Sequence, residues 1–260
     1  MKSHEKLVQY EYQQGKGNVI RSMFKDIDAD CYIMADGDDT NPPEPEMVDL
    51  ILQGKAEMVI GDRLSSTYFT ENKRLFHNSG NRIVRWLINK LFNVHVKDIM
   101  TGSRAFSYSF VKTFPVLSKG FEIETEMTIH AAANNLSMVE VPVNYRDRPE
   151  GSESKLNTYS DGIKVLKTIA RLFKEYKPTA FFGLFALLFL IISVAFGAPV
   201  FYEYFQTGLV ERFPTLIFSG FMLIVSLLLW ITGLILEVIV KKNRQMFELV
   251  WIRTKREKIN

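Results

Sequence analysis

The chain has 260 residues, of which 47% are hydrophobic, and a formal net charge of +3. This length allows one sizeable domain and an additional segment. Its single cysteine, Cys31, excludes an intramolecular disulfide bond, and we expect it to be a small buried side chain in a reducing compartment. The first residues are polar, so no secretory signal is expected there.

Apolar runs and helical periodicities alternate along residues 1–160, which predicts an α/β domain. A weak alternation over 6–13 indicates a strand, and Gly15-Lys16-Gly17 ends it. The other expected strands are residues 31–35, 57–61 and 137–145, with a loop that runs into a strand over 98–106. The expected helices are residues 18–26, 44–52, 78–92 and 122–134. This order predicts a mostly parallel sheet with helices on both faces.

An acidic loop follows the apolar run that ends at Ala35. Its sequence is Asp36-Gly37-Asp38-Asp39-Thr40-Asn41-Pro42-Pro43, and the prolines prevent the strand from continuing. Ligands of open α/β sheets bind at the carboxyl ends of strands. Carboxylates gathered there suit a hard divalent cation that is shared with substrate phosphates. The alternative is an acidic, solvated turn, because acidic turns commonly follow strands.

Residues 161–177 predict an amphipathic helix, with apolar side chains on one face and Lys164, Lys167, Arg171 and Lys174 on the other. Basic amphipathic helices of this kind lie in membrane interfaces. An ordinary surface helix packed on the domain shows the same pattern. Because an apolar segment follows directly, we favour the interfacial position.

Two apolar segments, residues 179–201 and 214–240, are each long enough to span a bilayer. Lysine and arginine are concentrated on the outer flanks of this pair, which places both flanks in the cytoplasm. We therefore expect a cell-membrane protein with two spans and both termini in the cytoplasm. The expected parts are a catalytic domain over 1–160, an interfacial helix over 161–178, a hairpin over 179–240 and a basic cytoplasmic tail over 241–260.

Short motifs follow one another along the domain. They are Gly15-Lys16-Gly17 with Arg21, Asp36-Gly37-Asp38, Gly61-Asp62-Arg63, Asp98 with Thr101-Gly102-Ser103-Arg104, Lys119-Gly120-Phe121-Glu122 with Glu126, and Tyr145-Arg146-Asp147-Arg148 with Gly151, Ser154 and Lys155. Together with the terminal hairpin, their order and spacing resemble membrane-anchored family 2 glycosyltransferases of the polyprenyl-phosphate type. The resemblance implies a Rossmann-like GT-A fold. It also implies inverting transfer of a sugar from a UDP- or GDP-hexose to a polyprenyl phosphate at the membrane.

The same resemblance implies roles for individual residues. Asp38, Arg104 and Glu126 would be catalytic, and Lys16, Arg21, Asp36 and Arg63 would bind the donor. Arg146, Arg148, Ser154 and Lys155 would bind the acceptor phosphate, because arginine forks suit phosphate oxygens. Asp36 and Asp38 would hold Mg²⁺ or Mn²⁺, which would neutralise charge on the departing nucleoside diphosphate. The expected partners are a nucleotide sugar, a polyprenyl phosphate and membrane lipid, with no nucleic acid. The resemblance also allows a homo-oligomer, but no residue fixes the oligomeric state.

The chain departs from this family at its start. The family's opening strand, with a Pro-x-Tyr-Asn-Glu segment that contacts the nucleotide base, does not occur before Lys6, so we expect an N-terminally shortened domain. A shortened, non-catalytic homologue that binds partners or lipid is therefore one alternative. A processive polysaccharide synthase is the other, but Arg85-Trp86 lacks the glutamine of the Gln-x-x-Arg-Trp element of those enzymes.

Overall fold

The computed structural model describes residues 12–36, 44–63, 65, 75–120, 122–144 and 158–259. The chain divides into two compact units. One unit contains residues 1–169 together with 247–260, and the other contains residues 170–246. The expected strand over 6–13 lies almost entirely outside the described residues.

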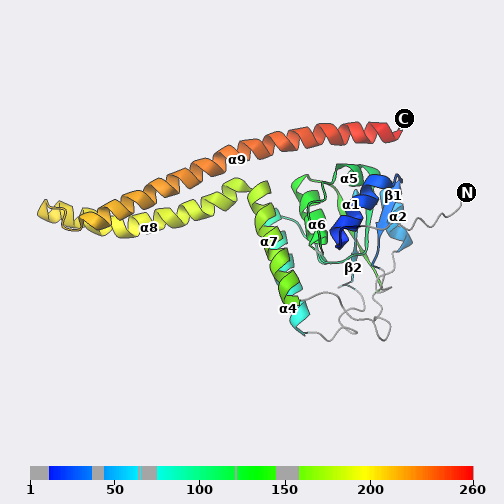
Figure 1. Cartoon of the computed structure of the whole chain (residues 1–260), viewed down its shortest axis with the longest axis horizontal. Helices are drawn as coiled ribbons and strands as arrows, with labels where there is room; N and C mark the ends of the chain where they lie inside the picture. The colour runs from blue at the N-terminus through cyan, green and yellow to red at the C-terminus, as the bar shows by residue number, and fades with distance from the viewer. Residues whose placement is uncertain are drawn as a thin grey trace, which may run out of the picture. The chain divides into compact units, whose positions relative to one another are not determined.

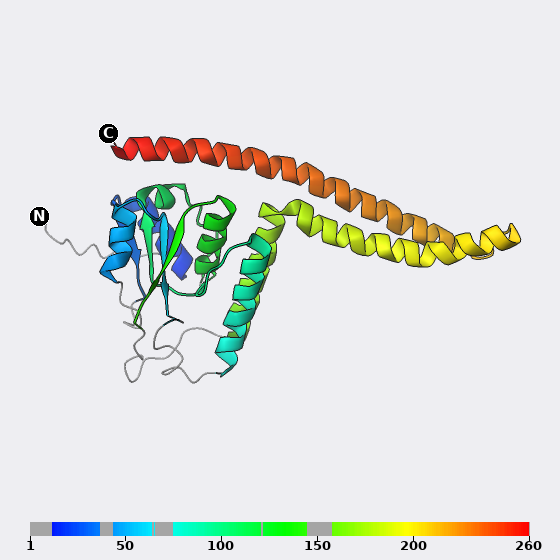
Figure 2. The same ribbon diagram turned by 180° about the vertical axis from the view of Figure 1, so that it is seen from behind.

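A four-stranded sheet forms the centre of the first unit (Figures 1 and 2). Its strands are β1 (Cys31–Met34), β2 (Met58–Asp62), β3 (Arg104–Ser107) and β4 (Met138–Pro142), in the order β1-β3-β2-β4. Strand β3 pairs antiparallel with both of its neighbours, and β2 pairs parallel with β4. Three strands therefore point the same way and one is reversed. The carboxyl ends of β1, β2 and β4 consequently share an edge with the beginning of β3.

Helices cover both faces of this sheet, as the alternating pattern predicts. Helix α2 (Pro45–Leu52) packs on one face, where its Met47 and Ile51 join a buried cluster with Val59, Ala105 and Val141. Every residue of β2 is buried, because the other face is covered as well. The helices on that side include α1 (Lys16–Asp26), α5 (Tyr108–Thr113) and α6 (Ile123–Ala133), and the unit also contains α4 (Leu75–Phe92).

The end of the last helix packs on this unit. Helix α9 runs from Phe213 to Ile259, well beyond the expected apolar segment. Its Phe247 lies edge-to-face against His130 of α6, with ring centroids 5.4 Å apart, and Trp251 is only 7% exposed. Lys255 makes an ion pair with Glu57 at 2.7 Å. The sequence predicts residues 247–259 as part of a basic tail, but they form a helix packed on this first unit, which is called the soluble unit below.

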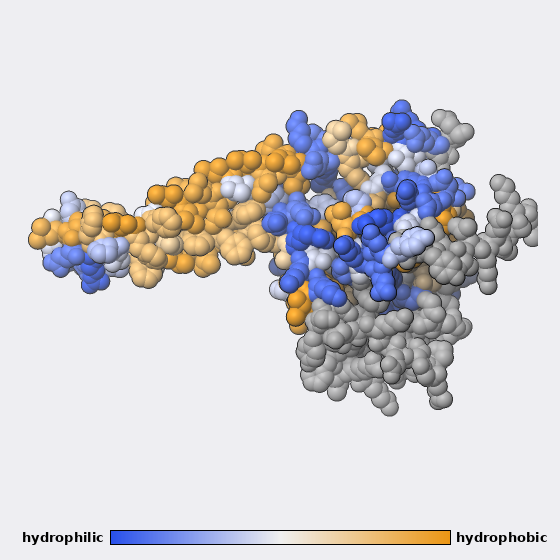
Figure 3. Space-filling view, viewed as in Figure 1, coloured by the Kyte–Doolittle hydropathy of each residue, from blue (hydrophilic) through white to orange (hydrophobic). Residues whose placement is uncertain are grey.

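The second unit contains two helices that are long and apolar enough to cross a membrane, α8 (Pro178–Thr207) and the first part of α9. Their exposed side chains are mostly apolar, as the orange surface in Figure 3 shows. Gly208 ends α8 in the left-handed region with a φ of 72°. Helix α7 (Thr158–Tyr176) precedes α8 and is shared between the two units. The expected fold class, a mixed α/β domain with an apolar helical pair, is confirmed.

Small and polar residues line the seam between α8 and α9 at seven-residue spacing, as in an antiparallel coiled coil. They are Thr179, Ala186 and Ser193 on α8, and Ser219, Ser226 and Gly233 on α9. Hydroxyls donate across the seam to backbone oxygens: Thr179 to Gly233 at 3.2 Å, Ser226 to Ala186 at 2.8 Å and Ser193 to Ser219 at 2.8 Å. Small residues allow close helix approach, and such hydrogen bonds stabilise helix pairs in lipid.

Candidate active site

Loops from three strands meet at the shared edge of the sheet. Asp36 follows β1, Asp62 ends β2, and Thr101-Gly102-Ser103 leads into β3. Met34 and Ile60 both pair with Arg104, so the three strands are in register at this edge. A Cβ added to Gly102 would lie 2.2 Å from Oδ2 of Asp36. Any larger residue would have to displace this carboxylate, so Gly102 lets the loop lie directly against Asp36.

Lys16 connects two acids at this edge. Its Nζ lies 2.6 Å from Oδ1 of Asp36 and 2.6 Å from Oε1 of Glu124, the second residue of α6. Burial alone would lower the pKa of Lys16, but attraction by Glu124 and Asp36 outweighs burial and raises its pKa above the ordinary value. Lys16 is therefore firmly protonated. Glu124 is 4% exposed, whereas the Asp36 side chain is one-third exposed and accessible to a ligand.

The beginning of α1 is held against the loop before α6. The backbone N–H of Gly17 donates to the oxygen of Lys119 at 3.0 Å, and a Cβ added to Gly17 would lie 2.1 Å from the oxygen of Ser118. Arg21 donates to the oxygen of Val116 through both Nε (3.1 Å) and Nη2 (2.6 Å). These contacts bring Lys16 to the sheet edge, because they fix the helix that carries it.

Glu126 of α6 holds the same loop from the other side. Its carboxylate accepts hydrogen bonds from the backbone N–H groups of Leu117 (3.3 Å) and Ser118 (2.8 Å). Glu126 is 3% exposed. Its carboxylate thus satisfies loop donors inside the protein.

Arg104 is fully buried at the start of β3. Its guanidinium donates to the backbone oxygens of Thr101 (3.1 Å) and Ile99 (2.5 Å) and to the hydroxyl of Thr128 on α6 (2.9 Å). Burial lowers the pKa of Arg104 to about 10, which still leaves it charged at neutral pH. We expected Arg104 to be catalytic, but its donors are directed into the protein. The physical reason is that the 99–103 loop turns its carbonyl groups inward and requires a buried donor.

Arg63 forms a bidentate ion pair with Asp98, with distances of 2.7 and 3.0 Å. Glu140 on β4 accepts from the backbone N–H groups of Lys97 (2.6 Å) and Asp98 (3.3 Å), and burial raises the pKa of its carboxyl. Asp62 lies 3.7 Å from the ammonium of Lys97. This network fixes the loop after β2 to the loop before β3.

The structure brings together some of the expected site residues. Lys16 and Asp36 are in direct contact, and Arg63 lies on the loop after the neighbouring strand β2. Asp38 and the acceptor-site residues lie outside the described residues: Arg146, Arg148, Ser154 and Lys155. Among the described residues, no three His, Cys, Asp or Glu side chains gather as a metal site. Glu124 was not predicted as a site residue, because its only signal in the sequence is an acid in the first turn of a helix.

No protein-family model matches the chain. The uncharacterised protein SF2094/S2216 of Shigella flexneri is 41% identical over 161 residues, which are 62% of this chain and 99% of that protein. The chain belongs to the same family as this protein.

Relatives with a named activity lie further away. Glycosyltransferase AglJ of Haloferax volcanii is 28% identical over 238 residues, 90% of this chain and 77% of that protein. Dolichyl-phosphate hexose transferase of the same organism is 29% identical over 164 residues, 62% of this chain and 69% of that protein. The expected resemblance is thus confirmed: the chain is a homologue of glycosyltransferases.

Part of the chain is similar to a solved structure, that of glucosyl-3-phosphoglycerate synthase from Mycobacterium tuberculosis in complex with Mn²⁺, UDP and phosphoglyceric acid. It is 16% identical with a TM-score of 0.48, and the match covers 63% of this chain and 56% of that chain. The chain therefore corresponds to little more than half of the length of that enzyme.

Proposed function

We propose that this protein transfers a hexose from a UDP- or GDP-sugar to a polyprenyl phosphate, with inversion at the anomeric carbon. The observation that carries the proposal is the contact between Lys16 and Asp36 at the strand-end edge of the sheet. An accessible acid and a firmly protonated lysine are the groups that a metal-bound diphosphate requires there. The relationship to a dolichyl-phosphate hexose transferase supports the choice of a polyprenyl phosphate as acceptor.

In this proposal Lys16, Asp36 and Arg63 serve the donor. Lys16 is a point charge that can hold a diphosphate oxygen beside Asp36. Arg63 is oriented by its bidentate bond to Asp98. Arg21 lies on the same helix as Lys16 and acts on the donor indirectly, because its guanidinium fixes the 116–118 loop.

A divalent cation, Mg²⁺ or Mn²⁺, fits the donor chemistry of this edge. Asp36 offers a partly exposed carboxylate to the ion, and hard cations prefer such oxygens. Asp38, two residues further along the acidic loop, would be the second ligand. When bound, the ion would offset the negative charge of the departing nucleoside diphosphate.

The reaction is a single displacement at the sugar. An oxygen of the acceptor phosphate forms a bond to the anomeric carbon, and the bond from this carbon to the nucleoside diphosphate breaks with its electron pair on the diphosphate. The acceptor is already anionic at neutral pH, so orientation matters more than a strong base. Arg146, Arg148, Ser154 and Lys155 would hold the acceptor phosphate in line.

Arg104 and Glu126 act as positioning residues in this proposal. Arg104 ties the loop that carries Gly102 to helix α6, and Glu126 ties the 117–118 loop to the same helix. Both loops border the contact between Lys16 and Asp36. Substituting Arg104 or Glu126 would disturb the geometry of the site without removing a group that touches substrate.

We propose that α8 and the first part of α9 anchor the protein in the cell membrane, with the soluble unit and both termini in the cytoplasm. The basic flanks of the apolar segments support this orientation. A polyprenyl phosphate presents its phosphate at the same surface, so the anchor would bring acceptor and site together.

The test is a transfer assay with the full chain in detergent. Undecaprenyl phosphate, Mn²⁺ or Mg²⁺, and labelled UDP- and GDP-hexoses would be supplied separately. We expect one labelled lipid product carrying a single sugar, and its loss in Asp36→Asn and Asp38→Ala. Glu46→Gln, which changes an exposed acid on α2, is the matched control. Absence of product from every donor would contradict the proposal in favour of a non-catalytic homologue, and a polymeric product would indicate a processive synthase.

A further inference from the structure

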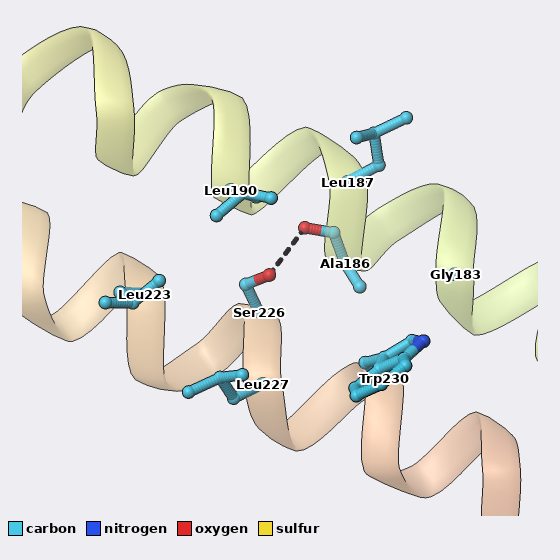
Figure 4. A pocket seen from close by; sticks show the side chains of 8 residues that line it. All are labelled: Gly183, Ala186, Leu187, Leu190, Leu223, Ser226, Leu227 and Trp230. Carbon is cyan, nitrogen blue, oxygen red and sulfur yellow. Dashed lines mark hydrogen bonds between the residues drawn. The ribbon is translucent and has the colours of Figure 1, made fainter.

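A groove lies between the two helices of the apolar hairpin. Its walls include Gly183, Leu187 and Leu190 from α8 and Leu223, Leu227 and Trp230 from α9 (Figure 4). Its volume is about 360 Å³. Leu187, Leu227 and Trp230 are about half exposed, so the groove is open to the surroundings of the hairpin.

The groove is hollow and apolar for identifiable reasons. Gly183 leaves open space, because a Cβ added there would meet nothing within 4 Å. The hydroxyl of Ser226, which also borders the groove, donates to the backbone oxygen of Ala186 at 2.8 Å (Figure 4). The polar group is thereby satisfied within the seam, and the remaining surface is hydrocarbon. A flexible hydrocarbon chain suits such a surface.

A partly buried cation lies on the preceding helix, α7. Nε and Nη2 of Arg171 are inaccessible to water and have no hydrogen-bond acceptor among the residues that the structure describes. Inaccessible guanidinium N–H groups without an acceptor are unfavourable unless an anion accepts from them. Arg171 stands six residues before the junction of α7 and α8 at Lys177, and Gly183 stands six residues after it. The hairpin unit thus offers an apolar groove and an incomplete anion site close together in the chain.

We propose that this groove holds the first isoprene units of the acceptor, while Arg171 binds its phosphate as the lipid enters. The identity of the lipid rests on the proposed function. The groove has the volume of a small-molecule site, whereas a helix from a second copy has a diameter of about 10 Å or more and needs a longer surface. A lipid with an anionic head and a methyl-branched hydrocarbon tail matches both the cation Arg171 and the apolar groove. We therefore assign a polyprenyl phosphate as the occupant.

The first experiment fills the groove. Gly183→Leu adds a side chain at a groove-lining position where an added Cβ meets no atom within 4 Å. We expect the KM for undecaprenyl phosphate to rise about tenfold, since a displaced isoprene unit loses several buried carbons. The KM for the nucleotide sugar should change little, which also shows that the variant is folded. Gly220→Leu is the matched control, because Gly220 is on α9, also has open space and does not line the groove.

The second experiment does not depend on catalysis. A benzophenone-bearing polyprenyl phosphate should crosslink to peptides containing Gly183 or Trp230 in the full chain, and undecaprenyl phosphate should compete. Arg171→Gln should weaken this crosslinking about tenfold, and Lys174→Gln, which changes an exposed cation on the same helix, should not. A wild-type chain that transfers no sugar but shows these crosslinks would overturn the proposed function alone. Crosslinks elsewhere, equal competition by a phospholipid, or a change of oligomeric state in Gly183→Leu would overturn the groove assignment.

Discussion

Replacing Lys16 by methionine tests whether charge pairing holds the candidate site together. Methionine keeps much of the length of the lysine side chain and removes only the ammonium that joins Asp36 and Glu124. Asp36 is partly exposed, so water replaces the lost partner. Glu124 is buried and has no such replacement. The free energy of unfolding should therefore fall mainly because of Glu124.

The size of this loss has an upper limit that depends on pH. The least costly response of an unpaired buried Glu124 is to bind a proton. At pH 7 the solution is 2.5 pH units above the ordinary pKa of 4.5, and at about 1.36 kcal/mol per unit this costs about 3 kcal/mol. At pH 5 the same response costs less than about 1 kcal/mol.

The sign of the pH dependence follows from linkage. In the wild type, the raised pKa of Lys16 gives stability that is fully present below its ordinary value of 10.5 and is lost only as the pH rises through the folded pKa. In Lys16→Met, the folded protein binds an extra proton on Glu124, so the variant should approach the wild type as the pH falls from 7 to 5. The double variant Lys16→Met/Glu124→Gln should recover most of the loss at pH 7.

Urea unfolding of the full chain in detergent measures these differences. Trp251 is the buried tryptophan among the three in the chain and reports on the soluble unit. We expect a lower midpoint with an unchanged slope at pH 7 and nearly coincident curves at pH 5. A loss of stability that is equal at both pH values, or that the double variant does not recover, would show that Lys16 acts through packing and would refute the charge argument.

Three further predictions concern the interior of the soluble unit. Arg104→Lys keeps the charge but loses hydrogen bonds to at least two of the three oxygen acceptors. The free energy of unfolding, measured in urea, should therefore fall by about 3 kcal/mol or more. A loss below about 1 kcal/mol would contradict the assigned hydrogen bonds. Burial lowers the pKa of His130 from 6.5 to about 4, so the folded protein loses stability as the pH falls from 6.5 towards 4. His130→Gln should remove about 2 kcal/mol of the loss between pH 7.5 and 5, measured by melting at these two pH values. Trp251→Ala should cost about 3–5 kcal/mol if the end of α9 is part of the core. Leu249→Ala, at a position that is 63% exposed, should stay within about 0.5 kcal/mol, and equal effects of the two would contradict the observed packing.

Local patterns predicted most of the elements but not the direction of every strand. The apolar runs at 31–35 and 57–61 correspond to β1 and β2, and the long amphipathic pattern at 78–92 corresponds to most of α4. Nothing in the four residues of β3 shows that this strand is reversed, because its direction depends on pairing with β1 and β2 far away in the chain. The short helix α5 was also not predicted, since six residues carry too little periodicity.

The candidate site could be located from the sequence, but its internal contacts could not. Strand ends followed by acids indicated the edge of the sheet where Lys16 and Asp36 meet. The partners of Lys16 are 20 and 108 residues away, and no local pattern encodes such a pair. Arg104 was expected to be catalytic because the family resemblance includes it with Thr101-Gly102-Ser103. Its burial depends on carbonyl groups of a loop whose conformation is set by the strand that follows it.

The periodicity of α9 explains why its basic end is not a free tail. Ser219, Ser226 and Gly233 face α8 at seven-residue spacing, and the same spacing continues to Phe247 and Thr254, which contact or are buried in the soluble unit. The lysines and arginines at 241, 242, 244, 253 and 256 lie off this stripe and leave it apolar or small. A count of charges over 241–260 therefore indicates a solvated segment, whereas the seven-residue stripe indicates packed positions in the hairpin and again at Phe247 and Thr254. For a long helix, the spacing of its small and aromatic residues is the more informative signal, because charges on the other face are compatible with either outcome.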